Sequence, residues 1–228
     1  MEADNEVSHW GQSQPNVQEN AGKSKKRGPR KPKRIYEGLN EEEFIKLLKA
    51  TRHVYKNPDK IKNKKAERRC ELHRIIFLLS FGSGLRISEV LSLQPEDIDF
   101  KAKKIFIRQG KGSKDRVTFL TKLFREKYLK YLPIKIQKRA VEAVFQRNTM
   151  KCGINRPIGS FLRAGKEIPI FRFHLHCLRH GFALRCLDSG MPLHQLQILM
   201  GHENIATTSR YLKSNPSDAI ESAMEAGL

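Results

Sequence analysis

Apolar residues recur at helical spacing in the first half of the chain. Leu39–Leu48 has a cap residue and three glutamates followed by an apolar stripe, which predicts a helix. Residues 57–69 are rich in lysine and predict a solvated link and a helix start. Leu72–Leu79 is almost entirely apolar and long enough for a buried helix. The glycines in Phe81–Gly84 end that helix, and Ile87–Leu93 predicts the next one.

Short strands are predicted after these helices. Ile105–Ile107 and Val117–Leu120 are rich in β-branched and aromatic residues, and Gln109–Asp115 between them contains two glycines. Ile98–Phe100, which follows a Pro-Glu-Asp turn, predicts a further strand. We therefore expect a small antiparallel sheet that includes a hairpin.

The remaining pattern predicts more helices. One covers Leu123–Leu132 and is ended by Pro133, and another covers Ile136–Phe145. Residues 148–165 are rich in glycine and basic side chains and are predicted to be a loop. The chain as a whole is predicted to be mostly helical, in the α+β class.

Helical spacing returns in the last third of the chain. The apolar residues of Leu178–Leu187 suit the buried face of one helix. Leu193–Met200 predicts a second helix, which Gly201 can end. A short helix is expected after Asn204, and Asp218–Leu228 predicts a small terminal helix with one apolar side.

Charge changes the picture most at the N-terminus. The chain has 228 residues and a net charge of +20, a surplus that points to a polyanion such as nucleic acid. Residues 1–22 are polar without an apolar period and are predicted to be disordered. The basic run Lys23–Arg34 resembles a minor-groove-binding arm, although a solvated tail with only non-specific phosphate contacts is the alternative. The DNA-contact candidates in this run are Lys25, Lys26, Arg27 and Arg30.

Cysteine usage and hydropathy exclude several classes of protein. The four cysteines show no C-x-x-C pair or disulfide framework, which indicates a reducing cytoplasm. The His- and Cys-containing segment His174–His180 lacks a second ligand pair at finger-like spacing, so no metal site is predicted. No apolar run approaches the ~20 residues of a membrane span. We expect a cytoplasmic protein without a membrane segment, metal or cofactor.

Candidate chemistry is concentrated in the last third of the chain. His176, Arg179 and His180 stand at i, i+3 and i+4 and share one helix face, while His202 and Tyr211 follow. An arginine fork matches two phosphate oxygens, a histidine can donate to phosphate or carry a proton, and a tyrosine hydroxyl can act as a nucleophile. No carboxylate among these residues could hold Mg²⁺ or activate water. The set therefore favours covalent attack on a phosphodiester without a metal.

Four motifs together are similar to those of the tyrosine recombinase (phage integrase) family. Gly84–Val90 resembles the first arginine motif of the family, and Gly110–Arg116 resembles its lysine-bearing hairpin. His176–His180 and the pair Gly201-His202 with its following tyrosine resemble the second half of the active site. The match covers roughly Gly38–Leu212 in the order and approximate spacing of the family. It implies the family's mixed, mostly helical catalytic domain with a small antiparallel sheet.

The resemblance implies a role for each of five catalytic residues. Tyr211 would attack the scissile phosphate and form a 3′-phosphotyrosyl link. Arg86 and Arg179 would clamp the non-bridging oxygens, with His176 and His202 assisting. Their contribution would be stabilisation of charge in the transition state.

The resemblance also implies supporting roles. Lys111 would protonate the leaving 5′ oxygen, with a purely phosphate-binding role and Lys114 as the alternatives. Glu89 would pair with an active-site arginine and hold it in place. His180 would donate to the backbone or pack below the site, with a catalytic role as the alternative. Two further phosphate-contact candidates, with a solvated surface as the alternative, are Arg156 and Arg163.

The function implied is site-specific DNA recombination without metal or ATP. Double-stranded DNA would be the partner, four protomers on two sites would be the working unit, and an accessory DNA-bending protein is a further candidate partner. A type IB topoisomerase, which would relax supercoils as a monomer, is the second hypothesis. A non-catalytic DNA-binding relic is the third. The expected location is the nucleoid in the cytoplasm.

Three regions are predicted along the chain. Residues 1–36 would be a disordered basic tail, residues 37–215 the catalytic domain, and residues 216–228 a helix that contacts a neighbouring protomer or caps its own domain. About 36 tail residues cannot form the separate helical domain that precedes the catalytic domain in most of the family. The resemblance then implies either a short, catalytic-domain-only form, similar to Xer-like recombinases and fimbrial-switch invertases, or a degenerate relic.

Overall fold

The structure is a computed structural model, and it describes residues 37–53, 64–108, 115–202 and 205–209. All of these belong to the unit Arg34–Leu228, and the other unit, Met1–Lys33, lies outside them. Several predicted segments also lie outside the described residues. These are the N-terminal tail, the first part of the lysine-rich link, the loop of the predicted hairpin and the C-terminal helix.

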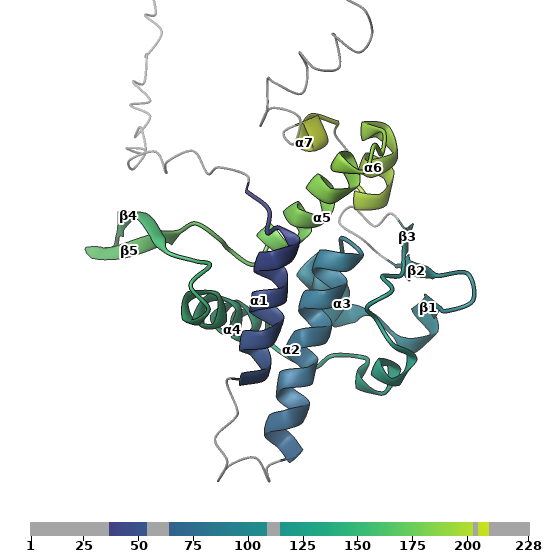
Figure 1. Ribbon diagram of the computed structural model, residues 1–228, viewed down its shortest axis with the longest axis horizontal. Coiled ribbons are helices and arrows are strands. Elements are labelled where there is room, and N and C mark those ends of the chain that lie inside the picture. Colours follow the sequence, from purple (N-terminus) through teal and green to yellow (C-terminus); the bar gives the residue numbers. More distant parts are fainter. Residues whose placement is uncertain (1–36, 54–63, 109–114, 203–204, 210–228) are drawn as a thin grey trace, which may run out of the picture. The chain divides into compact units, whose positions relative to one another are not determined.

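A long helix, α2 (Lys64–Gly82), is central to the packing of the other helices (Figure 1). It contacts three of them, α1 (Glu41–His53), α3 (Ile87–Ser92) and α5 (Cys177–Asp188). Helix α1 also contacts α4 (Lys138–Lys151). At the start of α1, the Asn40 side chain accepts a hydrogen bond from the Glu43 N–H at 2.8 Å, and the Glu43 carboxylate accepts one from the Asn40 N–H at 3.0 Å. The helices predicted from the early apolar stretches are confirmed.

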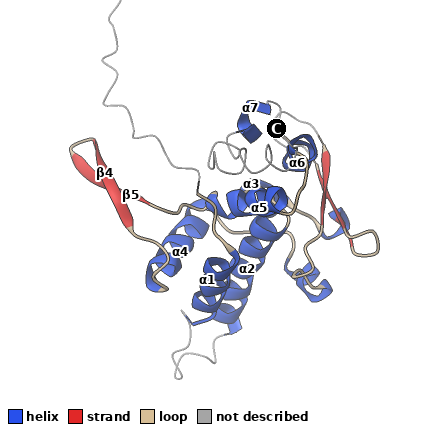
Figure 2. Ribbon diagram, turned by 45° about the horizontal axis from the view of Figure 1, so that its top comes forward, coloured by secondary structure: helices blue, strands red, loops and turns tan. Residues whose placement is uncertain are grey.

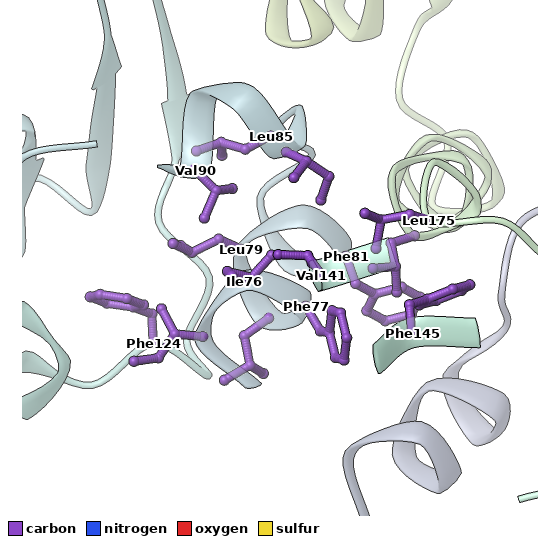
Figure 3. Packing of buried hydrophobic residues seen from close by; sticks show 14 of the residues in the cluster. Ile76, Phe77, Leu79, Phe81, Leu85, Val90, Phe124, Val141, Phe145 and Leu175 are labelled. Carbon is purple, nitrogen blue, oxygen red and sulfur yellow. The ribbon is translucent and has the colours of Figure 1, made fainter. Parts of the chain in front are cut away.

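Aromatic side chains of α2 lie in the middle of the hydrophobic core (Figure 3). Phe81 stacks on Phe44 of α1 with ring centroids 3.8 Å apart, and Phe77 meets Phe145 of α4 edge-on at 5.9 Å. All four rings are buried. Because such contacts hold the end of α2 in place, they also set the position from which the chain turns towards Arg86.

Three short strands form the predicted antiparallel sheet, in the order β1–β2–β3. They are β1 (Ile98–Asp99), β2 (Lys104–Ile107) and β3 (Arg116–Phe119). Ile105 and Thr118 lie opposite each other and are buried, which fits the alternation expected of a half-buried sheet. Thr118 Oγ1 donates to the carbonyl of Ser83 at 3.1 Å, so the sheet is tied to the end of α2.

The helix predicted over Leu123–Leu132 is present, but it is shorter than predicted and is not an α-helix. The structure has a 3₁₀ helix, η3 (Glu126–Tyr131), in which the Tyr128 and Leu132 N–H groups bond to carbonyls three residues earlier. Both side chains are buried. The segment is short, which favours a 3₁₀ helix over an α-helix. Its buried side chains anchor it to the core, and Pro133 cannot continue an α-helix.

The prediction of a loop over residues 148–165 is wrong. Helix α4 extends into this segment, and β4 (Pro157–Arg163) follows it. Strand β4 pairs with β5 (Lys166–Phe171) in a two-stranded antiparallel hairpin that is separate from the first sheet (Figure 2). The described residues therefore contain two small sheets where one was predicted.

The residue pattern does not predict this hairpin, and the reason is physical. Gly159 and Pro169 interrupt the alternation by which strands are usually predicted. In this two-stranded sheet each strand pairs on one side only, and a proline whose nitrogen lies on the unpaired side of an edge strand costs no ladder hydrogen bond. The turn residues Ala164 and Gly165 have φ values of 49° and 74°, and positive φ at both positions is common in two-residue hairpin turns.

The last described elements follow the predicted pattern. Helix α6 (Leu193–Met200) ends at Gly201, whose φ of 58° places it in the left-handed region. A single turn, α7 (Ile205–Thr208), comes next, and Tyr211 lies outside the described residues. Within the described ranges, no helix combines the length and apolar character that crossing a bilayer requires.

Candidate active site

Arg179 lies inside the fold, on the first turn of α5. Its side chain is 1% exposed, its Nη1 donates to the carbonyl of Gly84, and its Nη2 donates to the carbonyl of Met200. A buried guanidinium requires such partners because it has lost its water. Arg179 therefore links the turn that precedes Arg86 to the end of α6.

Arg86 reaches the same place from the start of α3. Its backbone N–H donates to Glu89 Oε2 at 2.7 Å, and its Nη1 donates to Glu89 Oε1 at 2.8 Å. Its Nη2 donates to the carbonyl of Gly201 at 3.0 Å. The expected contact between Glu89 and an arginine of the site is therefore present. The Arg86 side chain is 20% exposed, so this guanidinium can be reached from solvent.

A third arginine completes the cluster, and the sequence did not indicate its role. Arg116, at the start of β3, donates from Nη1 and Nη2 to the two carboxylate oxygens of Glu89, both at 2.7 Å. Its Nε donates to the carbonyl of Leu199 at 3.0 Å. The signal that could have found it is its place in the lysine motif, five positions after Lys111.

The end of α6 is where the three guanidiniums meet. Consecutive carbonyls each accept from a different arginine: Leu199 from Arg116, Met200 from Arg179, and Gly201 from Arg86. The last carbonyls of a helix have no partner within it and carry partial negative charge, so they attract cations. Because His202 comes directly afterwards, the arginines also fix the segment that holds this histidine.

Glu89 is the carboxylate that the three arginines share, since Arg179 Nη1 is also only 3.8 Å from its Oε2. Burial acts to raise the pKa of Glu89, but the bonds from Arg116 and Arg86 outweigh it and lower the pKa to about 2. Three guanidiniums and one carboxylate leave two surplus positive charges. Such a surplus suits an anion with several oxygens, and phosphate is the obvious example.

The ring of His202 is held from both sides. Its Nε2 is 3.4 Å from Arg179 Nη2, and its Nδ1 is 2.9 Å from Thr208 Oγ1. Thr208 is fully buried and ends α7, three residues before Tyr211. Burial, and next the charge of Arg179, lower the pKa of His202 to about 4. The imidazole is therefore neutral at pH 7 and can donate from one nitrogen while accepting at the other.

Two more histidines lie at the start of α5. The ring of His176 meets that of His180 edge-on, with centroids 4.8 Å apart. Burial, and next the charge of Arg179, lower the pKa of His176 to about 4, while burial, and next His176, lower that of His180 to about 3. His180 is 5% exposed. In the described part of the chain, no three or more His, Cys, Asp or Glu side chains are arranged to hold a metal ion.

The structure thus brings together part of the predicted set. Arg86, Glu89, Arg179 and His202 are joined by direct contacts, with His176 and His180 beside them on α5. Arg156 is exposed just ahead of β4, and the side chain of Arg163 is not described. The predicted residues outside the described ranges are Lys25, Lys26, Arg27, Arg30, Lys111, Lys114 and Tyr211.

Gly201→Ala is expected to lower the free energy of unfolding by about 1–3 kcal/mol. A Cβ at Gly201 would be 2.7 Å from Arg116 Cδ, and the φ of 58° disfavours any side chain. Chemical denaturation measures the change. Gly153→Ala is the matched control, because its φ of 73° carries the same strain but no atom lies within 4 Å of its added Cβ. Equal losses from the two variants would contradict tight packing of Arg116 on Gly201.

The chain is similar to known proteins in both sequence and fold. Residues 37–218 match the model of the phage integrase family. The tyrosine recombinase XerA of Thermococcus onnurineus is 32% identical over 190 residues, which cover 83% of this chain and 62% of that protein. The catalytic domain of the bacteriophage HP1 integrase superposes with a TM-score of 0.50 at 23% identity, over 83% of this chain and 94% of that domain.

A further solved structure with the same fold is that of the XerH site-specific recombinase bound to its difH substrate. It superposes with a TM-score of 0.57 at 23% identity and covers 84% of this chain but 54% of XerH. The chain therefore spans only 62% of the length of the Thermococcus onnurineus protein and 54% of the XerH chain.

Proposed function

Because the chain belongs to the phage integrase (tyrosine recombinase) family, we propose that it is a site-specific DNA recombinase that cuts and rejoins strands through a 3′-phosphotyrosyl intermediate. The observation that carries the proposal is the convergence of Arg86 and Arg179 on neighbouring carbonyls directly before His202. Residues far apart in the chain are thereby gathered into a positively charged site. A site of this charge fits a phosphodiester.

Arg86 and Arg179 bind the two non-bridging oxygens of the scissile phosphate. Each guanidinium Nη group carries two N–H bonds, so the donors already engaged with carbonyls do not exhaust its capacity. Glu89 holds Arg86 in orientation through two bonds, and the carbonyls of Met200 and Gly201 hold both forks at the same end of α6. Donors fixed in this way stabilise the negative charge that develops on the non-bridging oxygens without reorganising during the reaction.

Tyr211 is the nucleophile in this proposal. A bond forms between its hydroxyl oxygen and phosphorus, the bond from phosphorus to the 5′ oxygen breaks, and Lys111 gives a proton to the leaving 5′ oxygen. His176 and His202 are neutral at pH 7, so either can accept the proton that the tyrosine loses or donate to the phosphate. His180 supports His176 by packing against its ring.

The second step reverses the first with a different strand. A 5′-hydroxyl from the partner duplex attacks the phosphorus of the phosphotyrosyl link and gives its proton to Lys111, while the released Tyr211 oxygen takes a proton back from His176 or His202. One phosphodiester thereby replaces another. The exchange conserves the bond and requires neither ATP nor a metal ion. The working unit is four protomers on two DNA sites in the nucleoid, with residues 216–228 as a contact between protomers and an accessory DNA-bending protein as a further partner.

DNA contacts extend beyond the site in this proposal. Residues 37–215 form the catalytic domain, and the basic run within residues 1–36 binds phosphate. The side chains proposed to contact DNA are Lys25, Lys26, Arg27, Arg30, Lys114, Arg156 and Arg163.

Deleting residues 1–34 is expected to weaken DNA binding and to flatten its dependence on salt. The slope of log K against log salt is negative, and its magnitude decreases by about 0.9 on duplex DNA for each phosphate that the protein no longer neutralises. Titrations at several salt concentrations measure the slope. Deleting residues 1–22 alone is the matched control, because that segment contains no lysine or arginine. If the longer deletion leaves the slope of the full chain unchanged, the tail does not bind phosphate.

A plasmid assay tests the function as a whole. The purified chain is incubated, in chelator and without ATP, with supercoiled plasmids that carry two copies of the DNA flanking its own gene. Inverted, deleted or joined products are expected. Relaxed circles without recombinant junctions would favour the topoisomerase hypothesis, and unchanged plasmid despite tight binding would favour a non-catalytic DNA-binding protein.

A further inference from the structure

We propose that Arg116 is a positioning residue for strand cleavage, which holds Glu89 and the end of α6 so that Arg86 and His202 are correctly placed. The proposal rests on the proposed function, since it concerns how the same site is assembled.

All three donor nitrogens of Arg116 are already engaged. Nη1 and Nη2 form a fork on the two oxygens of Glu89 at 2.7 Å each, and Nε donates to the carbonyl of Leu199 at 3.0 Å. The side chain is 8% exposed. Arg116 differs from Arg86 and Arg179 in that both of its Nη groups face the Glu89 carboxylate. We therefore assign it a contribution that passes through the groups that it contacts.

The first of these groups is Glu89. Its Oε1 accepts from both Arg86 Nη1 and Arg116 Nη1, and its Oε2 accepts from the Arg86 N–H and Arg116 Nη2. Arg116, which comes from β3, thus gives each carboxylate oxygen a second hydrogen bond. Without it, each buried carboxylate oxygen would keep only a single one of these hydrogen bonds, and the orientation that Glu89 gives to Arg86 would weaken.

The second group is the end of α6. Helix α6 contacts β3, and the bond from Arg116 to Leu199 lies three residues before His202. Arg116 also begins β3 directly after Asp115, at the end of the segment that contains Lys111. One side chain therefore ties Glu89, which holds the Arg86 turn, to the end of α6 that precedes His202. A displacement of about 1 Å in such a site can cost roughly a hundredfold in rate.

The positioning role predicts that loss of Arg116 changes the pH dependence of the cleavage rate. The charged groups that face Glu89 are Arg86 at the start of α3, Arg116 on β3 and Arg179 on α5. Burial raises the pKa of Glu89, and the hydrogen bonds from Arg116 are the strongest influence that lowers it. Removing Arg116 should therefore raise that pKa. The ionised Glu89 carboxylate holds Arg86, so its protonation should slow cleavage. A variant without Arg116 should therefore lose rate at a pH at which the wild type keeps its rate.

The test is the rate of covalent adduct formation on duplex DNA that flanks the chain's own gene, stopped with detergent at about pH 5.5 and about pH 8. Arg116→Gln is expected to be slowed roughly tenfold to a hundredfold at the higher pH with its Kd for DNA unchanged, and more at the lower pH. Arg116→Lys should recover part of the acid tolerance, because it keeps a charge beside Glu89, but not the full rate, because it lacks the fork.

Arg108→Gln is the matched control. Arg108 stands at the other end of the same hairpin loop, where its Nε contacts Asp97 Oδ1 at 2.7 Å, and it does not contact Glu89. Its rate should stay within about twofold of the wild type, because the exposed Arg108 side chain is not linked to Glu89 or to the end of α6 by the contacts that Arg116 makes.

Each other outcome counts against the proposal. A wild-type rate and pH profile for Arg116→Gln would overturn the positioning role. So would a loss of rate that is equal at both pH values and matched by a loss of folded protein in thermal unfolding, because that result describes a merely structural residue. The absence of an adduct with the wild type would overturn the proposed function, and the positioning role with it.

Discussion

Tyr211→Phe should bind DNA with the affinity of the wild type and form no covalent adduct. Only the hydroxyl oxygen is removed, and that oxygen is the atom that bonds to phosphorus in the proposed reaction. Loss of a nucleophile is expected to reduce the rate of cleavage by about 10⁴-fold or more. Gel-shift titration measures the affinity, and detergent-stopped reactions resolved by electrophoresis measure the adduct.

Tyr131→Phe is the matched control for that experiment. Tyr131 is a half-buried tyrosine at the end of η3, so the same hydroxyl is removed at a place remote in sequence from the cluster. This variant should form the adduct at the wild-type rate. An adduct that persists in Tyr211→Phe would show that another residue attacks the phosphate, and the assignment of Tyr211 would be wrong.

Arg179→Lys should lose cleavage by roughly 10²- to 10³-fold, because a lysine cannot present two donors in a plane to the phosphate. It should also lose about 2–4 kcal/mol of stability, since the buried carbonyls of Gly84 and Met200 would be left short of donors. The rate of adduct formation, under conditions in which the variant is still folded, measures the loss of cleavage. Denaturant titration measures the loss of stability.

Arg185→Lys separates the two effects of that substitution. Arg185 is on the same helix, donates to the carbonyl of Phe81 and lies over its ring, with the guanidinium carbon 3.9 Å from the centroid. Its replacement should lower stability without changing the rate of the folded protein. Near-normal cleavage by Arg179→Lys, or an equal loss of rate by Arg185→Lys, would contradict a specific role of Arg179 at the phosphate.

Local patterns predicted the elements that carry the site. The apolar spacing of α5 and α6, and the glycines before Arg86 and at position 201, are properties of adjacent residues and can be recognised in one sequence. The contact between Glu89 and Arg86 was also within reach, because the two residues are three positions apart at the start of a helix. The same local signals supported the small sheet, whose buried positions alternate in the expected way.

The position of Arg116 could not be predicted in the same way. Its partners Glu89 and Leu199 are 27 and 83 residues away, so no periodicity in the sequence connects them. The three consecutive carbonyls that accept hydrogen bonds from the arginines are backbone atoms, so the residue types at these positions do not indicate the contacts. The β4–β5 hairpin was missed because its glycine and proline resemble loop chemistry, and only its pairing reveals the strands.

The most direct measurement is to identify the residue and the DNA end in the trapped adduct. Wild-type protein reacts in chelator with a nicked duplex that carries the site mapped on the plasmid, so that the released 5′ end diffuses away. The adduct is then digested and its peptide and nucleotide are sequenced. The proposal predicts a 3′-phosphate joined to Tyr211. A link to another residue, or to a 5′-phosphate, would contradict the central claim that this chain cleaves DNA as a tyrosine recombinase.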